Sequence, residues 1–384
     1  MKKLFIILGL VLVVFALYVT FFAPSNELYS PLGSLKPTTH APQPANYIVL
    51  GFAPYWNLKK LSAESLTSIT HFAYFHLLLN GDGTVYKKTN RREEDPGFTN
   101  YKRLLAGTVS RGDKPLIITV MPESQTALSQ SIASSSSREK TINTLLNILS
   151  ESKAAGINID YEPLGDISES TKQNFTLFIK ELNFKLDKLD KPEILLTISI
   201  YGSAGSKPRI WDLKALEPYT NYFVVMSYDY TMPGSSSAGP NSPLRGSGDL
   251  FEHDVIKNIS EISKLVKSEK ILLGIPFYGY QWKTVDASKY SPVESKGSTA
   301  SLEKIEEMLR DKTLELVWDR NTLTPYGIAS ESGQISQIYF ENATSMKLKL
   351  DFVKSTNLGG IAIWALGYEG QNSWVWPVIN TLNK

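Results

Sequence analysis

The sequence predicts a (β/α)8 TIM barrel that carries a small α+β insertion between its seventh and eighth strands. Short apolar runs alternate with longer polar, helix-like stretches along about 340 residues, which is room for eight βα units. Several runs are β-branched and nearly continuous, which is typical of parallel strands buried on both faces. About 80 residues separate the last two runs, where one barrel unit needs about half that number.

The expected elements follow one another from residue 47 onward. We expect barrel strands at Ile48–Pro54, Ile69–Phe75, Leu116–Val120, Ile157–Glu162, Ile194–Ile200, Tyr222–Tyr228, Ile271–Phe277 and Gly360–Leu366. We expect helices between them at Tyr101–Ser110, Arg138–Ala155, Ser170–Lys188, Leu250–Lys267 and Thr344–Thr356. A doubly wound open sheet is the alternative fold, but no G-x-G-x-x-G motif follows the first strand to favour it.

The excess before the last strand, at about residues 281–342, predicts the inserted module. It holds a helix-like stretch and then alternating runs typical of strands, at Ser301–Arg310, Leu314–Trp318, Pro325–Ser330 and Gly333–Glu341. Glu331-Ser332-Gly333 predicts a hairpin turn between the last two runs. The module is therefore expected to be α+β.

The N-terminal region differs from the rest. Two lysines precede an uninterrupted apolar run, Leu4–Phe22, which has the roughly 17–25 residues of a membrane-spanning helix. Phe21 and Pro24 around Ala23 make a poor cleavage site, so residues 1–23 predict an uncleaved anchor that leaves the rest exported. Secretion after signal cleavage is the alternative. Residues 24–46, rich in Pro, Ser and Thr, predict a linker, and residues 47–384 predict the barrel domain.

Composition excludes several functions. The net charge is +2 and there is no Lys/Arg block, so nucleic acid is not an expected partner. There is no cysteine, and the four histidines have no ligand-type spacing, so we expect neither a metal site nor a cofactor. We expect the protein to act as a monomer.

The stretch Gly156–Pro163, GINIDYEP, is where the chemistry is expected. Asn158, Asp160 and Glu162 fall at every second position, so on a strand they share one face. In a barrel that face is the interior, and Glu162 lies nearest the carboxyl end, where barrel active sites lie. A one-sided antiparallel strand with its polar face in water is the alternative interpretation, and the alternation with helices argues against it.

Burying charge costs several kcal/mol per group unless the charge is paired or hydrogen-bonded, so three polar groups in a barrel interior indicate function. A carboxyl group at the mouth with a second beneath it suits general acid catalysis, because burial and a neighbouring negative charge raise its pKa toward the working pH. Paired carboxyl groups in this role indicate glycoside hydrolysis first.

Several stretches together resemble glycoside hydrolase family 18, which includes chitinases and N-acetylglucosaminidases. GINIDYEP resembles the family signature D-x-x-D-x-D-x-E. The first, sixth, seventh and eighth strands are similar to the family's motifs at PYW (Pro54–Trp56), VVMSYD (Val224–Asp229), ILLGIPFYGY (Ile271–Tyr280) and GGIAIWALG (Gly359–Gly367). The family also has an α+β insertion between its seventh and eighth strands, where this chain has its excess.

The resemblance implies substrate-assisted hydrolysis of N-acetylated polysaccharides. Glu162 would protonate the departing glycosidic oxygen while the substrate's own acetamido carbonyl attacks the anomeric carbon, with net retention. Asp160 would orient the acetamide, Tyr228 would donate a hydrogen bond to its oxygen with Asp229 beside it, and Trp364 would pack under the sugar. Further substrate-binding candidates in the similar motifs are Asn158, Tyr55, Tyr278 and Met226, although barrel filling is the better explanation for Met226.

Two positions depart from the signature. Ala155 replaces its first Asp and Asn158 replaces the middle one. Asn158 cannot take up a proton but can hydrogen-bond to Asp160, so we expect a changed pH profile and retained activity. The variant resembles peptidoglycan-directed and spore-cortex members of the family, which favours cell-wall glycan over chitin as substrate. The alternative function is a catalytically silent, lectin-like glycan-binding protein on the same barrel.

Overall fold

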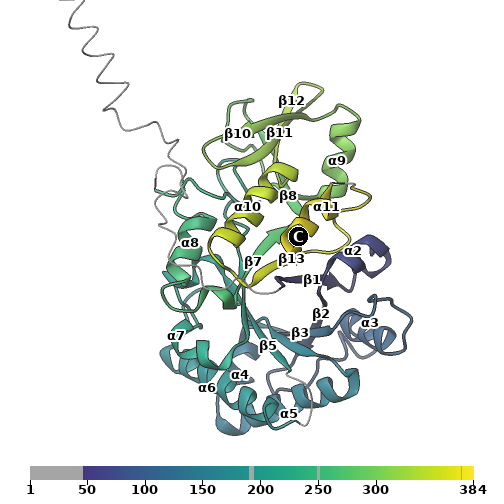
Figure 1. Ribbon diagram of the computed structural model, residues 1–384, viewed down its shortest axis with the longest axis vertical. Helices are drawn as coiled ribbons and strands as arrows, with labels where there is room; N and C mark the ends of the chain where they lie inside the picture. The colour runs from purple at the N-terminus through teal and green to yellow at the C-terminus, as the bar shows by residue number, and fades with distance from the viewer. Residues whose placement is uncertain (1–45, 190–193, 249–250, 373) are drawn as a thin grey trace, which may run out of the picture. The chain divides into compact units, whose positions relative to one another are not determined.

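The computed structural model describes residues 46–189, 194–248, 251–372 and 374–384. Eight parallel strands close into a barrel in the order β1-β13-β7-β6-β5-β4-β3-β2, which confirms the predicted fold (Figure 1). The barrel strands are β1 (Ile48–Pro54), β2 (His71–Leu79), β3 (Leu116–Pro122), β4 (Gly156–Ile159), β5 (Leu195–Tyr201), β6 (Tyr222–Met226), β7 (Ile271–Pro276) and β13 (Gly360–Trp364).

Helices cover the outside of the barrel, as Figure 1 shows. They are α2 (Ala63–Ser68), α3 (Pro96–Leu105), α4 (Gln125–Gln130), α5 (Ser135–Ser152), α6 (Glu169–Leu186), α7 (Leu213–Leu216), α8 (Val255–Ile262), α10 (Ala343–Ser355) and α11 (Val375–Ile379). The longest two begin at serine caps: the side chains of Ser134 and Ser168 accept hydrogen bonds from backbone N–H groups in the first turns of α5 and α6.

Two apolar layers stabilise the barrel. The larger lies between the strands and the helices, and α6 contributes Phe175, Phe178 and Leu182 to it from one face, at helical spacing. The smaller fills the barrel interior with side chains from alternate strand positions, namely Leu50, Phe52, Ala73, Phe75, Ile117, Val224, Leu272 and Ala362. The interior is therefore a packed core that leaves space only toward one end.

Several predicted bounds were wrong, most of them at strand ends. The structure ends β4 at Ile159 and β6 at Met226, before the expected ends at Glu162 and Tyr228. The chain leaves the hydrogen-bonded ladder there because it must turn into the loops at the barrel mouth, although the apolar pattern continues. In the opposite direction, β2 continues to Leu79 past a register shift between Tyr74 and Leu77. The helix expected at Leu250–Lys267 is also shorter, because α8 begins after the capping residue Asp254.

The insertion folds as the predicted α+β module. Its five-stranded antiparallel sheet has the order β10-β11-β12-β8-β9, and it lies at one end of the barrel domain in Figure 1. Its elements are β8 (Tyr278–Thr284), β9 (Ser298–Ser301), α9 (Leu302–Arg310), β10 (Glu315–Asp319), β11 (Thr324–Glu331) and β12 (Gln334–Tyr339). The sequence pattern did not predict β8 or β9 as separate strands.

The predicted hairpin turn is confirmed. Glu331 pairs with Gln334, and the two residues between them, Ser332 and Gly333, have φ of 50° and 82°. A two-residue turn with both central residues in the left-handed region matches the twist of the flanking strands, which explains the glycine at the second position.

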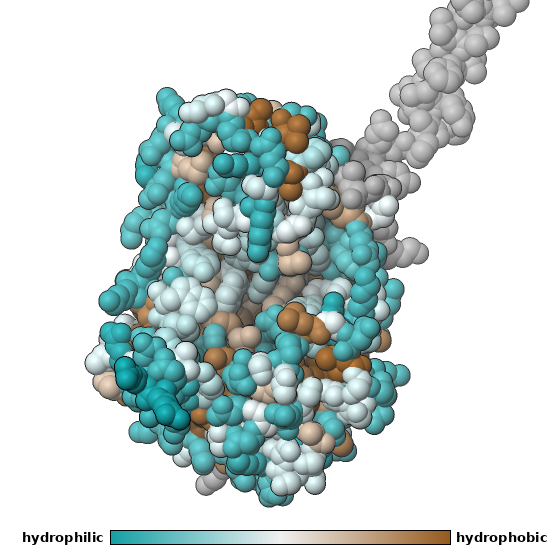
Figure 2. Space-filling view, turned by 180° about the vertical axis from the view of Figure 1, so that it is seen from behind, coloured by the Kyte–Doolittle hydropathy of each residue, from teal (hydrophilic) through white to brown (hydrophobic). Residues whose placement is uncertain are grey.

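The expected anchor, residues 1–23, and the expected linker up to residue 45 lie outside the described residues. Among the residues that are described, no helix is both long and apolar enough to span a membrane. The face drawn in Figure 2 is mostly hydrophilic, with hydrophobic residues in small separate patches.

Candidate active site

A cavity opens at the carboxyl ends of the barrel strands. Of the nine candidate site residues that the sequence singled out, seven line this cavity together with other barrel residues. The lining side chains are Phe52, Phe75, Asp160, Glu162, Ser199, Val224, Met226, Tyr228, Asp229, Tyr278 and Trp364. The barrel interior is apolar below the cavity, and carboxyl and phenol groups line the cavity itself.

Asn158 lies below this cavity and is fully buried. Its amide nitrogen donates to Ser199 Oγ at 3.0 Å, and its amide oxygen accepts from Thr197 Oγ1 at 2.8 Å. These partners lie on β5, because the register places Asn158 opposite Thr197. The expected hydrogen bond from Asn158 to Asp160 is absent among the described residues. The Asn158 amide nitrogen donates to Ser199 instead, and the Ser199 side chain lies between the two residues.

Asp160 is 3% exposed and one of its carboxyl oxygens, Oδ1, has no hydrogen-bond partner among the described residues. Burial, and next the negative charge of Glu162, raise the pKa of Asp160 well above its ordinary value, while a hydrogen bond from Ser199 lowers it. The pKa of Glu162 is also raised, mainly by burial and further by Asp229, while a hydrogen bond from Tyr201 opposes the shift. Both carboxyl groups therefore hold protons to higher pH than exposed ones.

The segment that carries Glu162 past the end of β4 is contacted by side chains from α4 and β5. Gln125 at the start of α4 donates through Nε2 to the backbone oxygen of Glu162 at 2.9 Å and accepts from the backbone N–H of Leu164 at 2.8 Å. The Tyr201 hydroxyl, which donates to the Glu162 carboxyl, lies 3.4 Å from the backbone oxygen of Pro163. The carboxyl group thus stands on a backbone that is fixed on both sides.

Tyr228 and Asp229 occupy the turn that follows β6. Asp229 has φ of 62°, a left-handed conformation that Asp tolerates better than most residues, and its N–H donates to Asn241 Oδ1 at 2.8 Å. Its Oδ1 accepts hydrogen bonds from the hydroxyls of Tyr278 and Tyr280, the latter at 2.7 Å. Burial raises the pKa of Asp229, and these two phenols oppose the shift.

Aromatic rings form the cavity floor around Trp364, the last residue of β13. Its ring centroid lies 4.5 Å from that of Phe75 and 6.0 Å from that of Phe52. The ring centroid of Trp56 lies 6.4 Å from that of Trp364. A flat aromatic surface beside a group of carboxyls and phenols can hold the apolar face of a sugar while its polar groups face the acids.

The structure does not bring every predicted residue to this cavity. Tyr55 lies in a separate groove beside Trp56, and Asn158 lies beneath the floor. The unpredicted residues include the hydrogen-bond partners of the carboxyl groups, namely Ser199, Tyr201 and Tyr280. The alternation in LLTISIY places Thr197, Ser199 and Tyr201 on one face of β5, and this signal could have identified two of them. No group of three or more His, Cys, Asp or Glu side chains within the described parts of the chain is placed to hold a metal ion.

Comparison with known proteins now gives the family. The family model of Glycosyl hydrolases family 18 matches residues 33–369, most of the chain. The chain therefore belongs to glycosyl hydrolase family 18. The family resemblance inferred from the motifs is confirmed.

Individual relatives are distant. The chain is 25% identical over 265 residues to a class V chitinase of Lotus japonicus, a match that covers 63% of this chain and 63% of that protein. It is 24% identical over 233 residues to the putative sporulation-specific glycosylase YdhD of Bacillus subtilis, covering 60% of this chain and 51% of that protein. The chain thus spans between about half and two thirds of the length of these curated relatives.

Solved structures share the fold. A class V chitinase from Nicotiana tobaccum superposes with a TM-score of 0.75 at 19% identity, over 88% of this chain and 99% of that one. A family 18 chitinase from Cycas revoluta, solved in complex with (GlcNAc)3, gives a TM-score of 0.75 at 19% identity, over 87% and 99% of the two chains. These structures support the barrel architecture.

Proposed function

We propose that the protein is a retaining glycosidase that hydrolyses β-1,4 linkages in glycans containing N-acetylglucosamine. The observation that carries this proposal is the convergence of Asp160, Glu162 and Tyr228 on one cavity floored by Trp364. Family membership supports the reaction class, and the class V chitinase among the relatives supports an N-acetylated substrate. The sporulation-specific glycosylase among them supports cell-wall glycan as the natural polymer.

Glu162 is the proposed general acid. It stands at the cavity wall, and burial raises its pKa, so the protonated form that donates to the leaving oxygen persists above the pH at which an exposed Glu ionises. As the glycosidic bond breaks, the proton passes from the Glu162 carboxyl to the departing oxygen. The water that later opens the intermediate returns a proton to the carboxylate.

Asp160 and Tyr228 are proposed to position the substrate's acetamide. In a substrate-assisted reaction the acetamide oxygen bonds to the anomeric carbon, and positive charge develops on the amide. The Asp160 carboxyl, with one oxygen free of partners, can accept the acetamide N–H and stabilise that charge. The Tyr228 hydroxyl can donate to the acetamide oxygen, because burial and Asp229 raise its pKa and keep it protonated.

The test is release of reducing ends from chitooligosaccharides and from purified peptidoglycan. We expect Glu162→Gln to lower kcat by at least about 100-fold, since general acid catalysis contributes roughly 10²–10⁴-fold. Glu139→Gln, at an exposed position of α5, is the matched control and should retain full activity. Activity that survives Glu162→Gln would contradict the assignment. Glycan binding by the unaltered protein without hydrolysis would favour the lectin-like function.

We further propose that the protein is exported and held to the membrane by residues 1–23. The apolar run Leu4–Phe22 supports the anchor, and the sporulation-specific glycosylase among the relatives is consistent with export. The full chain should stay with membranes through a carbonate wash. A shortened, soluble product in the medium would instead indicate a cleaved signal.

A further inference from the structure

A second groove lies beside the proposed active site. Two segments form it: the residues that follow β1 and the C-terminal half of α3 with its following loop. Its lining side chains are Tyr55, Trp56, Leu58, Lys59, Asn100, Arg103, Thr108, Val109 and Ser110. We call it the α3 groove.

Trp56 connects the α3 groove to the cavity. Its ring lies 6.4 Å from that of Trp364, which floors the cavity, and 4.9 Å from that of Tyr55, which lines the groove. The Trp56 side chain is 47% exposed, and its indole N–H donates to the Tyr368 hydroxyl at 3.3 Å, which fixes the ring. A glycan that continues from Trp364 over Trp56 therefore brings its substituents to the edge of the groove.

The α3 groove is basic. Its wall contains two cations, Lys59 and Arg103, and no carboxylate. Neither cation forms an ion pair with any residue that the structure describes, whereas the neighbouring Lys60 is paired with Glu303 and Lys102 with Glu94. Arg103 donates through one terminal nitrogen to Asn100 Oδ1 at 3.1 Å, which leaves its other donors available.

We propose that the α3 groove binds a carboxylate-bearing substituent of the glycan, so that the preferred substrate is an anionic N-acetylated glycan. This inference rests on the proposed glycosidase function. A guanidinium offers a fork of N–H donors that matches a carboxylate, and an ammonium adds a second charge. The exposed ring of Trp56 supplies an apolar surface for the sugar that carries the substituent. A neutral chitin chain has nothing to place between the two cations.

The probes are glycan strands of alternating N-acetylglucosamine and N-acetylmuramic acid, free of peptide, and the same strands with their lactyl carboxyls converted to amides. Strands that keep their stem peptides distinguish a peptide carboxylate from the lactyl one. Chitopentaose is the neutral reference. Both kcat/KM and binding are measured, the latter with Glu162→Gln so that the strands stay intact.

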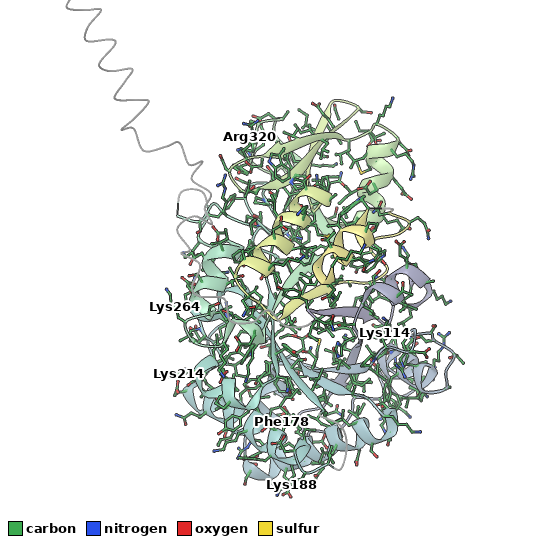
Figure 3. All side chains as sticks on the ribbon, in the orientation of Figure 1. Lys114, Phe178, Lys188, Lys214, Lys264 and Arg320 are labelled. Carbon is green, nitrogen blue, oxygen red and sulfur yellow. The ribbon has the colours of Figure 1, made fainter. Side chains whose placement is uncertain are left out.

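The variant is the double charge reversal Lys59→Glu/Arg103→Glu. Its matched control is Lys214→Glu/Lys264→Glu, which changes the net charge equally at exposed lysines; these lie across the barrel from α3 (Figures 1 and 3). Lys59→Arg/Arg103→Lys retains both charges and should retain the preference.

Exposed ion pairs contribute about 0.2–1 kcal/mol each, so two of them predict a roughly 2- to 30-fold preference for carboxylated over amidated strands. We expect this preference to appear mainly in KM and to weaken as salt is added. Lys59→Glu/Arg103→Glu should abolish it and leave chitopentaose hydrolysis within about twofold, and the control pair should change neither.

Equal kcat/KM for carboxylated and amidated strands would overturn the inference, and so would an equal loss in the Lys214→Glu/Lys264→Glu control. Either result leaves the proposed glycosidase function intact. If the unaltered protein hydrolyses none of the probes, the glycosidase proposal fails instead. In that case the binding measurements test the proposal for the α3 groove. Equal affinity for carboxylated and amidated strands would overturn it. Preferential binding of carboxylated strands that is lost in Lys59→Glu/Arg103→Glu would support it.

Discussion

Glu369, in the loop between β13 and α11, is 1% exposed and its carboxyl is held in an unfavourable environment for a charge. Its Oε2 accepts the Gly367 N–H at 2.6 Å, while its Oε1 has no partner among the described residues. Burial raises the pKa of Glu369 from 4.5 to about 7, with the charge of Glu303 adding to the shift and backbone N–H groups opposing it. The folded protein thus prefers this carboxyl protonated.

The sign of the effect on stability follows. Between pH 4.5 and 7 the unfolded chain has released this proton and the folded protein retains it, so the free energy of unfolding falls as pH rises. A shift of 2.5 units, from 4.5 to about 7, corresponds to about 3 kcal/mol at 1.36 kcal/mol per unit. Glu369→Gln removes this titration. The free energy of unfolding of the variant should therefore fall by about 3 kcal/mol less than that of the unaltered protein across the same pH interval.

Urea unfolding at pH 4.5, 5.5, 6.5 and 7.5 measures the difference. Other buried carboxyls titrate in both proteins and cancel when the two curves are subtracted. The amide of the Glu369→Gln variant also lowers the free energy of unfolding by about 1–3 kcal/mol at every pH. The reason is that its NH₂ group takes the place of Oε1, where there is no hydrogen-bond partner among the described residues, and this offset does not change with pH. A difference in free energy of unfolding that stays constant from pH 4.5 to 7.5 would refute the reasoning.

Three further predictions concern the buried polar groups. Lys349 is 0% exposed; its ammonium group donates hydrogen bonds to Glu341 and, at 2.7 Å, to both oxygens of Ser242. Lys349→Met should lower the free energy of unfolding, measured with urea, by about 3–5 kcal/mol, because it leaves the Glu341 carboxylate buried without its partner. Adding Glu341→Gln should recover part of this loss. Tyr201→Phe removes the hydrogen bond that lowers the pKa of Glu162; since the acid must be protonated, the alkaline limb of the kcat/KM profile should move to higher pH, and an unmoved limb would contradict the proposed acid. Asn158→Asp adds a buried carboxyl near Asp160 and removes the donor to Ser199; the added negative charge should raise the pKa of Glu162 and move the same limb to higher pH, and an identical pH profile would exclude this coupling.

Local patterns were sufficient for most of the fold. Strand β1 occurs with the predicted bounds, and the hairpin at Ser332 and Gly333 was predicted from its turn residues. The errors lie where the hydrophobic pattern and the hydrogen-bonded ladder separate. The pattern continues through Tyr161 while β4 has already ended at Ile159, because Tyr161 packs against the helices after its backbone has left the sheet.

The proposed site divides in the same way. Period two along GINIDYEP was enough to place Asp160 and Glu162 at one cavity, because the alternation of side chains continues in the residues that follow β4. The partners of these residues come from other strands. Ser199 reaches Asn158 because β4 and β5 pair in one register, and Asp229 is held by Tyr278 and Tyr280 from β8, which the sequence did not predict as a strand.

The sequence by itself determined the barrel, the inserted module and the row of polar groups along and just after the fourth strand, because periodicity and turn chemistry act within a few residues of the chain. The tertiary structure alone decided that Tyr55 faces the α3 groove, that Ser199 separates Asn158 from Asp160, and that Lys59 and Arg103 share one wall. Those relations depend on strand register and on how loops from distant parts of the chain meet when the barrel closes, and no local pattern encodes them.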